Sequence, residues 1–231
     1  QRLRGYQLTG SPHHVIRPLA VQADINAVLV VEYYPGEEFS HAIGRATGHG
    51  DDGHLYRRLT ALAWFLATQH NRTANGALVD FAPDGRYFDT VVGRLEHAGR
   101  LGRWEVEELG WLRDCWAERP RMWQDRQVWL HGDATPANFL FGHGMDVAAI
   151  DLERMKRGDR MFDVGRIAGE LQHSFMAETG DKARAEPFIG HFLWEYCGHF
   201  PDQESAFQSI TLRLPFYMAV NLLRIARNGY I

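Results

Sequence analysis

Lysine is almost absent from this chain of 231 residues. Only Lys156 and Lys182 occur, although arginine is plentiful, and the formal net charge is −4 at pH 7. A chain with a pI near 6.3 lacks the positive field that binding to nucleic acid or to an anionic membrane surface requires. We therefore expect neither nucleic acid nor a membrane among its partners.

Cysteine and long apolar runs are scarce as well. Cys115 and Cys197 stand alone, without the spacing of a zinc site or a disulfide framework, so we interpret both as reduced thiols of a cytoplasmic protein. No apolar run reaches the ~18 residues that span a bilayer, and residues 1–4 open no signal peptide. Because the chain has no initiator methionine, we expect it to begin inside a longer protein or after processing. Its oligomeric state stays open.

The hydrophobic pattern changes from strands to helices along the chain. With 45% apolar residues the chain can bury a sizeable core. Residues 1–9 resemble the end of a helix, and residues 15–21 and 27–34 read as strands that end at Pro35-Gly36. Helical periodicity then predicts helices near 37–46, 52–71, 87–99, 106–116, 162–176, 188–196 and 203–227. The last of these helices should bend before Pro215. Trp104, Trp111 and Trp116 occur at helical spacing and are expected in the core or along a groove.

Three short apolar runs surround the most informative stretch. Residues 128–130, 139–141 and 147–150 read as strands, and Asp133, Asn138 and Asp151 lie in the loops at their ends. We expect the strands to deliver these three side chains to one end of a small sheet. An amide and a carboxylate oxygen suit a divalent cation, and a free carboxylate beside them suits phosphoryl transfer.

These residues resemble a known family. The motif His131-Gly132-Asp133, followed by Asn138 and later by Ile150-Asp151-Leu152-Glu153, is similar to that of the aminoglycoside phosphotransferase and choline kinase family, which has a protein-kinase-like fold. The spacing from Asp to Asn is that of a kinase catalytic loop, with Gly132 where an arginine is usual. Residues 29–36 resemble the hinge between the two lobes of the family. The resemblance covers roughly residues 12–231.

The resemblance implies three kinds of site residue. One carboxylate accepts or orients the substrate hydroxyl, an amide and a second carboxylate hold Mg²⁺, and hinge backbone groups contact the adenine of ATP, with GTP as the alternative donor. Two further residues would brace the catalytic loop. In that order, the residues are Asp133 for the hydroxyl, Asn138 and Asp151 for the metal, Glu32, Tyr33 and Tyr34 for the nucleotide, and His131 and Asp163 for the loop.

The chain departs from the family in its first part. No glycine-rich loop precedes residue 27, and no lysine precedes Lys156. We therefore predict an α+β, protein-kinase-like fold from which most of the small lobe is missing. Residues 1–35 would be a remnant of the nucleotide-binding lobe that ends in the hinge. Residues 36–231 would form the helical large lobe, with a small β insert and the catalytic and metal site.

The predicted function is ATP-dependent transfer of a phosphoryl group to a hydroxyl of a small molecule. The family resemblance allows an aminoglycoside, an amino alcohol, a sugar or a similar metabolite as acceptor. Six acidic residues follow residue 176 and could serve a cationic acceptor, although a neutral sugar fits as well: Glu178, Asp181, Glu186, Glu195, Asp202 and Glu204. The alternative is a non-catalytic, pseudokinase-like module that binds a ligand or partner, and the missing lysine is its support.

Overall fold

The helices of the chain make up most of the structure. The computed structural model describes residues 3–22 and 28–228. Its α-helices are α1 (Phe39–His49), α2 (Asp52–Thr73), α3 (Ala82–His97), α4 (Arg103–Ala117), α5 (Met161–Thr179), α6 (Glu186–Cys197), α7 (Gln203–Thr211) and α8 (Leu214–Ala226). Short 3₁₀ helices occur at Leu3–Tyr6, Pro120–Met122, Pro136–Asn138, Leu152–Arg154 and Lys182–Ala185.

The strands form three small sheets. A five-stranded sheet has the order β1 (Thr9–Gly10), β2 (His13–Val15), β8 (Val147–Ala149), β7 (Phe139–Phe141) and β5 (Glu37–Glu38). Within it β2 and β8 are parallel and the other neighbours are antiparallel. Two further antiparallel pairs complete the set, β3 (Pro18–Gln22) with β4 (Val28–Val31) and β6 (Val128–Leu130) with β9 (Lys156–Gly158).

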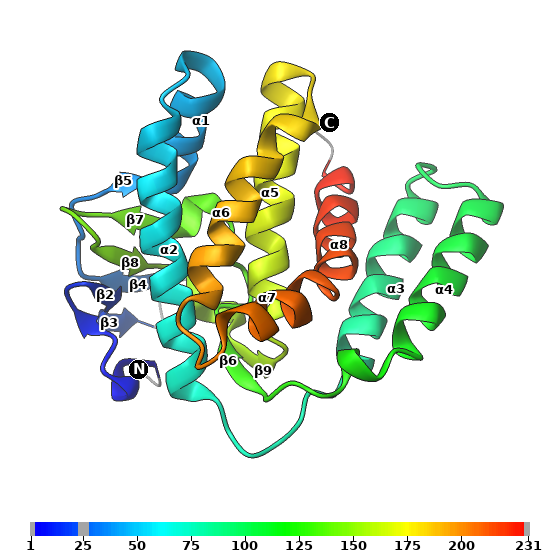
Figure 1. Ribbon diagram of the computed structural model, residues 1–231, viewed down its shortest axis with the longest axis horizontal. Coiled ribbons are helices and arrows are strands. Elements are labelled where there is room, and N and C mark those ends of the chain that lie inside the picture. Colours follow the sequence, from blue (N-terminus) through cyan, green and yellow to red (C-terminus); the bar gives the residue numbers. More distant parts are fainter. Residues whose placement is uncertain (1–2, 23–27, 229–231) are drawn as a thin grey trace.

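The elements follow one another across the molecule. In Figure 1 the five-stranded sheet and the β3–β4 pair lie at one side with α1 and α2 beside them, then α6 and α5, then α8, with α3 and α4 as a pair at the far side; β6 and β9 lie low in the middle. The α+β class with a mainly helical body and a small β insert is the class that the sequence predicts, and the structure confirms it. No helix in the described part of the chain combines the length and the apolar character needed to cross a bilayer.

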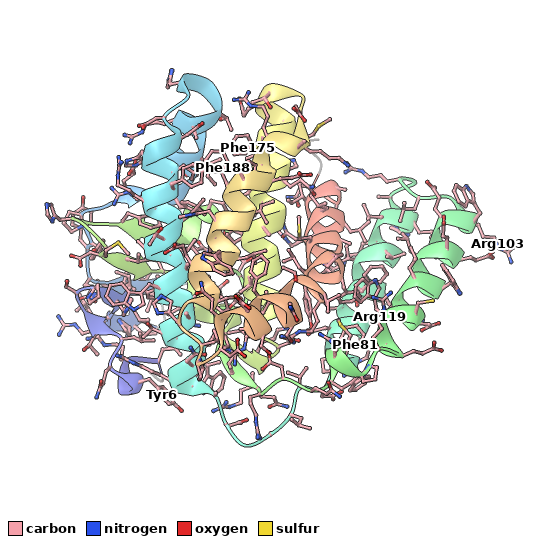
Figure 2. The ribbon with its side chains drawn as sticks, viewed as in Figure 1. Tyr6, Phe81, Arg103, Arg119, Phe175 and Phe188 are labelled. Carbon is pink, nitrogen blue, oxygen red and sulfur yellow. The ribbon has the colours of Figure 1, made fainter. Side chains whose placement is uncertain are left out.

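Helix α5 runs through the core. Residues 161–169 of this helix are all buried, because α8, α1 and α6 pack around it. Phe175 of α5 and Phe188 of α6 stack with their ring centroids 5.1 Å apart, as Figure 2 shows. On the other side α8 approaches so closely that Gly165 and Gly169 face Tyr217 and Asn221 without room for a side chain.

Asp51 begins α2 as the sequence predicts, since its side chain accepts a hydrogen bond from the backbone of His54. Four other expectations are wrong in detail. The strand expected over 15–21 is divided between β2 and β3, and the one over 27–34 ends at Val31, with Ala27 outside the described residues. Residues 3–6 form a 3₁₀ helix that leads into β1. Residues 37–38 form β5 instead of beginning a helix.

The C-terminal helix and the tryptophan interpretation also need correction. Residues 203–227 form two helices, α7 and α8, that are separated at Leu212-Arg213, and Pro215 lies in the first turn of α8 where a missing amide costs nothing. Helix α4 packs mainly on α3 and has no buried residue. Trp104 and Trp111 are therefore 67% and 63% exposed and do not belong to the core.

The three strands of the central motif are not in one sheet. β7 and β8 are antiparallel neighbours, as expected, but β6 pairs with β9, the segment that follows Asp151. Periodicity could not reveal this pairing, because three-residue strands carry too little pattern to choose a partner. The five-stranded sheet contains strands from both sides of Pro35-Gly36, the predicted domain boundary, and that division of the chain stays a prediction.

The contact between α5 and α8 gives a prediction about stability. A Cβ atom at Gly165 would lie 2.4 Å from the Cβ of Tyr217 and 3.1 Å from its carbonyl carbon, so Gly165→Ala forces the two helices apart. We expect it to lower the free energy of unfolding by about 1–3 kcal/mol, measured by urea denaturation. Gly190→Ala is the control, because that helical site has open space around it and should gain up to about 1 kcal/mol. Equal stability of the two variants would contradict the close packing described here.

Candidate active site

The loop between β6 and β7 is held against the segment that follows β8. Gly132 has a φ of +83°, a conformation that favours glycine. A Cβ atom there would lie 2.1 Å from the carbonyl oxygen of Arg154. Glycine therefore lets the loop touch the turn after Asp151, and the arginine usual at this position in kinases would not fit here.

Asp163 holds the loop through hydrogen bonds to its backbone amides. This carboxylate at the start of α5 is fully buried and accepts hydrogen bonds from the backbone amides of His131 (2.6 Å) and Gly132 (3.0 Å). Its third partner is the His70 ring, 3.2 Å away. Burial alone would raise the pKa of Asp163, but the bonds from His70 and the loop amide outweigh burial and lower it. The group is thus a buried carboxylate that organises two amides.

Two buried histidines support this arrangement as neutral rings. Burial lowers the pKa of both His70 and His131. The His131 ring lies 2.9 Å from the carbonyl oxygen of Ile150, and its other nitrogen lies 3.3 Å from the amide of Asp133. A neutral ring that donates through Nε2 and accepts through Nδ1 satisfies both contacts. The His131 ring therefore connects the loop to the end of β8.

Asp133 projects from this loop between two arginines. Its Oδ1 accepts a hydrogen bond from Arg166, which is buried and also donates to the carbonyl oxygen of Gly132 at 3.2 Å. Its Oδ2 lies 3.4 Å from Arg154, whose side chain is 61% exposed. One oxygen is therefore held by a fixed cation, and the other faces a cation that solvent and ligands can reach.

The ladder between β7 and β8 places Asn138 opposite the residue that precedes Asp151. Ile150 donates its backbone amide to the carbonyl oxygen of Asn138 at 3.0 Å. The Asn138 side-chain nitrogen donates to the carbonyl oxygen of Asp133 at 2.8 Å. Within the described residues its amide oxygen has no hydrogen-bond partner, and it is the atom that a cation could use.

Asp151 and Glu153 are two acidic residues in the short turn that follows β8. Asp151 has a left-handed backbone, with φ of +58°, which non-glycine residues seldom adopt. The Asp151 carboxyl, within hydrogen-bond reach, raises the pKa of Glu153, and burial adds to the effect. Within the described residues, no three or more His, Cys, Asp or Glu side chains lie close enough together to hold a metal ion by themselves. One amide and one or two carboxylates nevertheless fit Mg²⁺, which takes its remaining ligands from phosphates and water.

The hinge segment lies beside the same strands. β5, just after it, pairs with β7 through Glu38 and Leu140. Glu32 is fixed by its side chain, which accepts from the backbone amide of Arg17 at 2.6 Å and lies 2.7 Å from the His14 ring. The backbone amides and carbonyls of Tyr33 and Tyr34 make no hydrogen bond to other described residues. They are thus available to a ligand, and the Tyr33 side chain is 88% exposed.

The structure adds two residues that sequence reasoning missed. Arg166 was not singled out, although an arginine on the apolar face of α5, three residues after Asp163, is an available signal. The second is His70, in the last turn of α2. Its ring is buried between Asp163 and the hydroxyl of Tyr196 (2.9 Å), because α6 covers that face.

Comparison with known proteins agrees with this geometry. Residues 2–198 match the Phosphotransferase enzyme family. The chain belongs to that family of phosphotransferases. No curated protein sequence matches the chain significantly.

Solved structures share the fold at low sequence identity. A glucosamine kinase is 20% identical with a TM-score of 0.59, and the match covers 97% of this chain and 68% of the kinase. The ethanolamine kinase of Plasmodium vivax is 12% identical with a TM-score of 0.63, and the match covers 99% and 67%. An aminoglycoside phosphotransferase of Streptomyces rimosus, determined with ADP and streptomycin, is 16% identical with a TM-score of 0.56, over 96% and 78% of the two chains.

The buried carboxylate under the loop gives the second prediction. Asp163→Asn keeps the shape but replaces one acceptor oxygen by an NH₂ group that cannot accept from a loop amide. We expect a loss of on the order of 3 kcal/mol in the free energy of unfolding, measured by urea denaturation. Asp89→Asn is the control, since Asp89 pairs with Arg113 at the surface and should cost less than about 1 kcal/mol. Similar losses in both variants would contradict the role given to Asp163.

Proposed function

We propose that the protein transfers the γ-phosphoryl group of ATP to a hydroxyl of a small molecule, with Asp133 receiving or orienting that hydroxyl. The observation that supports this most is the β7–β8 ladder, which joins the ends of the strands so that Asn138 and Asp151 lie beside the loop of Asp133. Matched structures include a glucosamine kinase determined with glucosamine, ADP and inorganic phosphate, which supports a nucleotide donor.

The residues divide the work of phosphoryl transfer among themselves. Asn138 and Asp151 would hold Mg²⁺, which when bound neutralises charge on the phosphates. Asp133 would accept a hydrogen bond from the acceptor hydroxyl through Oδ2, where the exposed Arg154 now lies. The reaction depends mainly on position and charge, so a carboxylate fixed by the loop is sufficient. Glu32, Tyr33 and Tyr34 would present backbone groups to the adenine.

Arg166 would act as a positioning residue. Its guanidinium is buried, and it holds both Asp133 Oδ1 and the carbonyl oxygen of Gly132. This double contact fixes the orientation of the carboxylate toward the acceptor.

The unpaired state of both cysteines supports the proposal that the protein works in the cytoplasm.

The metal and base assignments give the third prediction. In the full-length protein Asp133→Asn should lower kcat by about 100-fold or more, because the neutral amide is no base. Asp151→Asn should instead raise the Mg²⁺ concentration needed for half-maximal turnover. Phosphate transfer from ATP to a panel of hydroxyl-bearing acceptors is the measurement.

Glu107→Gln on the exposed face of α4 is the control and should leave turnover unchanged. Full activity of Asp133→Asn would refute the role of Asp133. Tight ligand binding by the parent protein without any ATP turnover would favour a non-catalytic binding module.

Arg166 gives the fourth prediction. Arg166→Met should lower kcat by roughly tenfold or more while the KM values for ATP and acceptor change little, because the carboxylate loses its fixed orientation. Arg166→Lys keeps one cationic donor and should recover part of the kcat. Arg113→Met, which removes a surface arginine, is the control. A proportional change in KM, or no recovery with lysine, would show that Arg166 acts only in packing.

A further inference from the structure

A pocket of about 470 Å³ opens directly beside the loop of Asp133. Its floor is Thr135–Ala137, the three residues that begin two positions after Asp133. Its walls come from α1, α5, α8 and the residues just after α8, with Ser40 and Ile43, then Glu170, His173 and Ser174, then Arg224, Ile225 and Asn228. The volume is that of a small-ligand site. Asp133 does not line the pocket itself, but it belongs to the same loop and precedes the first lining residue of that loop, Thr135, by two positions.

The charges in the pocket cancel. Among the described residues that line it, Glu170 is the one carboxylate and Arg224 the one guanidinium. The two form an ion pair, and each side chain is only about one-seventh exposed, at 14% and 13%. Arg224 is held in place by Asn221, whose side-chain oxygen accepts from its Nε at 3.0 Å. The carboxylate therefore has its countercharge within the protein and needs none from a ligand.

The other acids of this region serve elsewhere. None of the six acidic residues after residue 176 lines the pocket. Asp181 and Asp202 accept hydrogen bonds from backbone amides as helix caps. Glu38 accepts a hydrogen bond from the Ser40 hydroxyl but does not itself line the pocket. Most of the lining surface is apolar, with Ile43, Pro136 and Ile225 contributing to it.

We infer that this pocket receives the phosphoryl acceptor and that the acceptor is an uncharged alcohol, such as a neutral sugar, and not a polyamine or amino alcohol. The inference rests on the proposed function. An ammonium group that entered the pocket would lose its hydration without gaining a free carboxylate, and that exchange is unfavourable. A neutral ring can place an apolar face on Ile43 and Ile225 and offer hydroxyls to Asp133 and the polar lining. The solved structures named above are, by contrast, kinases of amine-bearing compounds.

The test uses pairs of compounds that differ mainly in charge. Glucose and glucosamine exchange a hydroxyl for an ammonium group, and 3,3-dimethyl-1-butanol is the neutral carbon analogue of choline. We expect the full-length protein to prefer the neutral member of at least one pair by about tenfold or more, in calorimetric affinity and in kcat/KM for phosphate transfer. A preference for the cationic member, or binding of neither member of either pair at millimolar concentration, would overturn the inference.

A variant that changes the charge of the pocket tests whether the pairing of Glu170 with Arg224 causes the preference for neutral compounds. Arg224→Gln leaves Glu170 without its countercharge, so affinity should move toward the cationic member by at least about tenfold. The double variant with Glu170→Gln should return the preference to the neutral member. Arg103→Gln is the matched control, because Arg103 lies at the outer end of α4 (Figure 2), is 89% exposed in its side chain, and changes the net charge equally. An equal shift with Arg103→Gln, or none with Arg224→Gln, would overturn the inference.

The two proposals fail in different ways. If no acceptor is phosphorylated, the proposed function is wrong, and calorimetry still reports which member of each pair the pocket binds. If the cationic compounds are phosphorylated best, the phosphotransferase proposal stands and the neutral acceptor is wrong.

Discussion

The site depends on one buried carboxylate. Asp163 accepts hydrogen bonds from two consecutive amides of the loop that carries Asp133, and nothing of that loop could keep its shape without a buried acceptor for those amides. The carboxylate has no solvent contact, so the hydrogen bonds that hold the two loop amides also stabilise its negative charge. His70 completes the set from α2. Three elements distant in the chain, α2, α5 and the loop after β6, are thereby fixed to one point.

The remaining geometry follows from that anchor. With the loop fixed, the His131 ring reaches the carbonyl oxygen of Ile150 and connects the loop to the end of β8. The turn after β8 then packs against Gly132, where no side chain fits. Asn138 is thus held by its backbone contact with Ile150 and by its side-chain nitrogen, which donates to the carbonyl oxygen of Asp133. This arrangement leaves the Asn138 amide oxygen without a hydrogen-bond partner among the described residues, which is what a ligand to a hydrated cation requires.

Arginine side chains pair with the main carboxylates around the site. Buried or half-buried guanidinium groups pair with the carboxylates that matter most, Arg166 with Asp133 and Arg224 with Glu170. Arginine suits these positions because it keeps its charge when buried and its planar group can hold a carboxylate and a carbonyl together. The consequence is a proposed base with a fixed orientation beside a pocket without net charge. The scarcity of lysine is consistent with that preference for fixed, planar cations.

The sequence alone determined the class of protein and the order of its main features. The spacing of Asp133, Asn138 and Asp151 predicted the loop, and helical periodicity predicted most of the helices, because both signals are local. The tertiary structure decided what depends on partners distant in the chain. β6 pairs with β9, α7 and α8 separate at Leu212-Arg213, and Trp104 and Trp111 of α4 face solvent. The charge pair of Glu170 and Arg224 became visible only once α5 and α8 were packed together, because a charge that is paired across two helices leaves no periodic pattern in either. The bond from Arg166 to Asp133 likewise depends on the contact between α5 and the loop after β6.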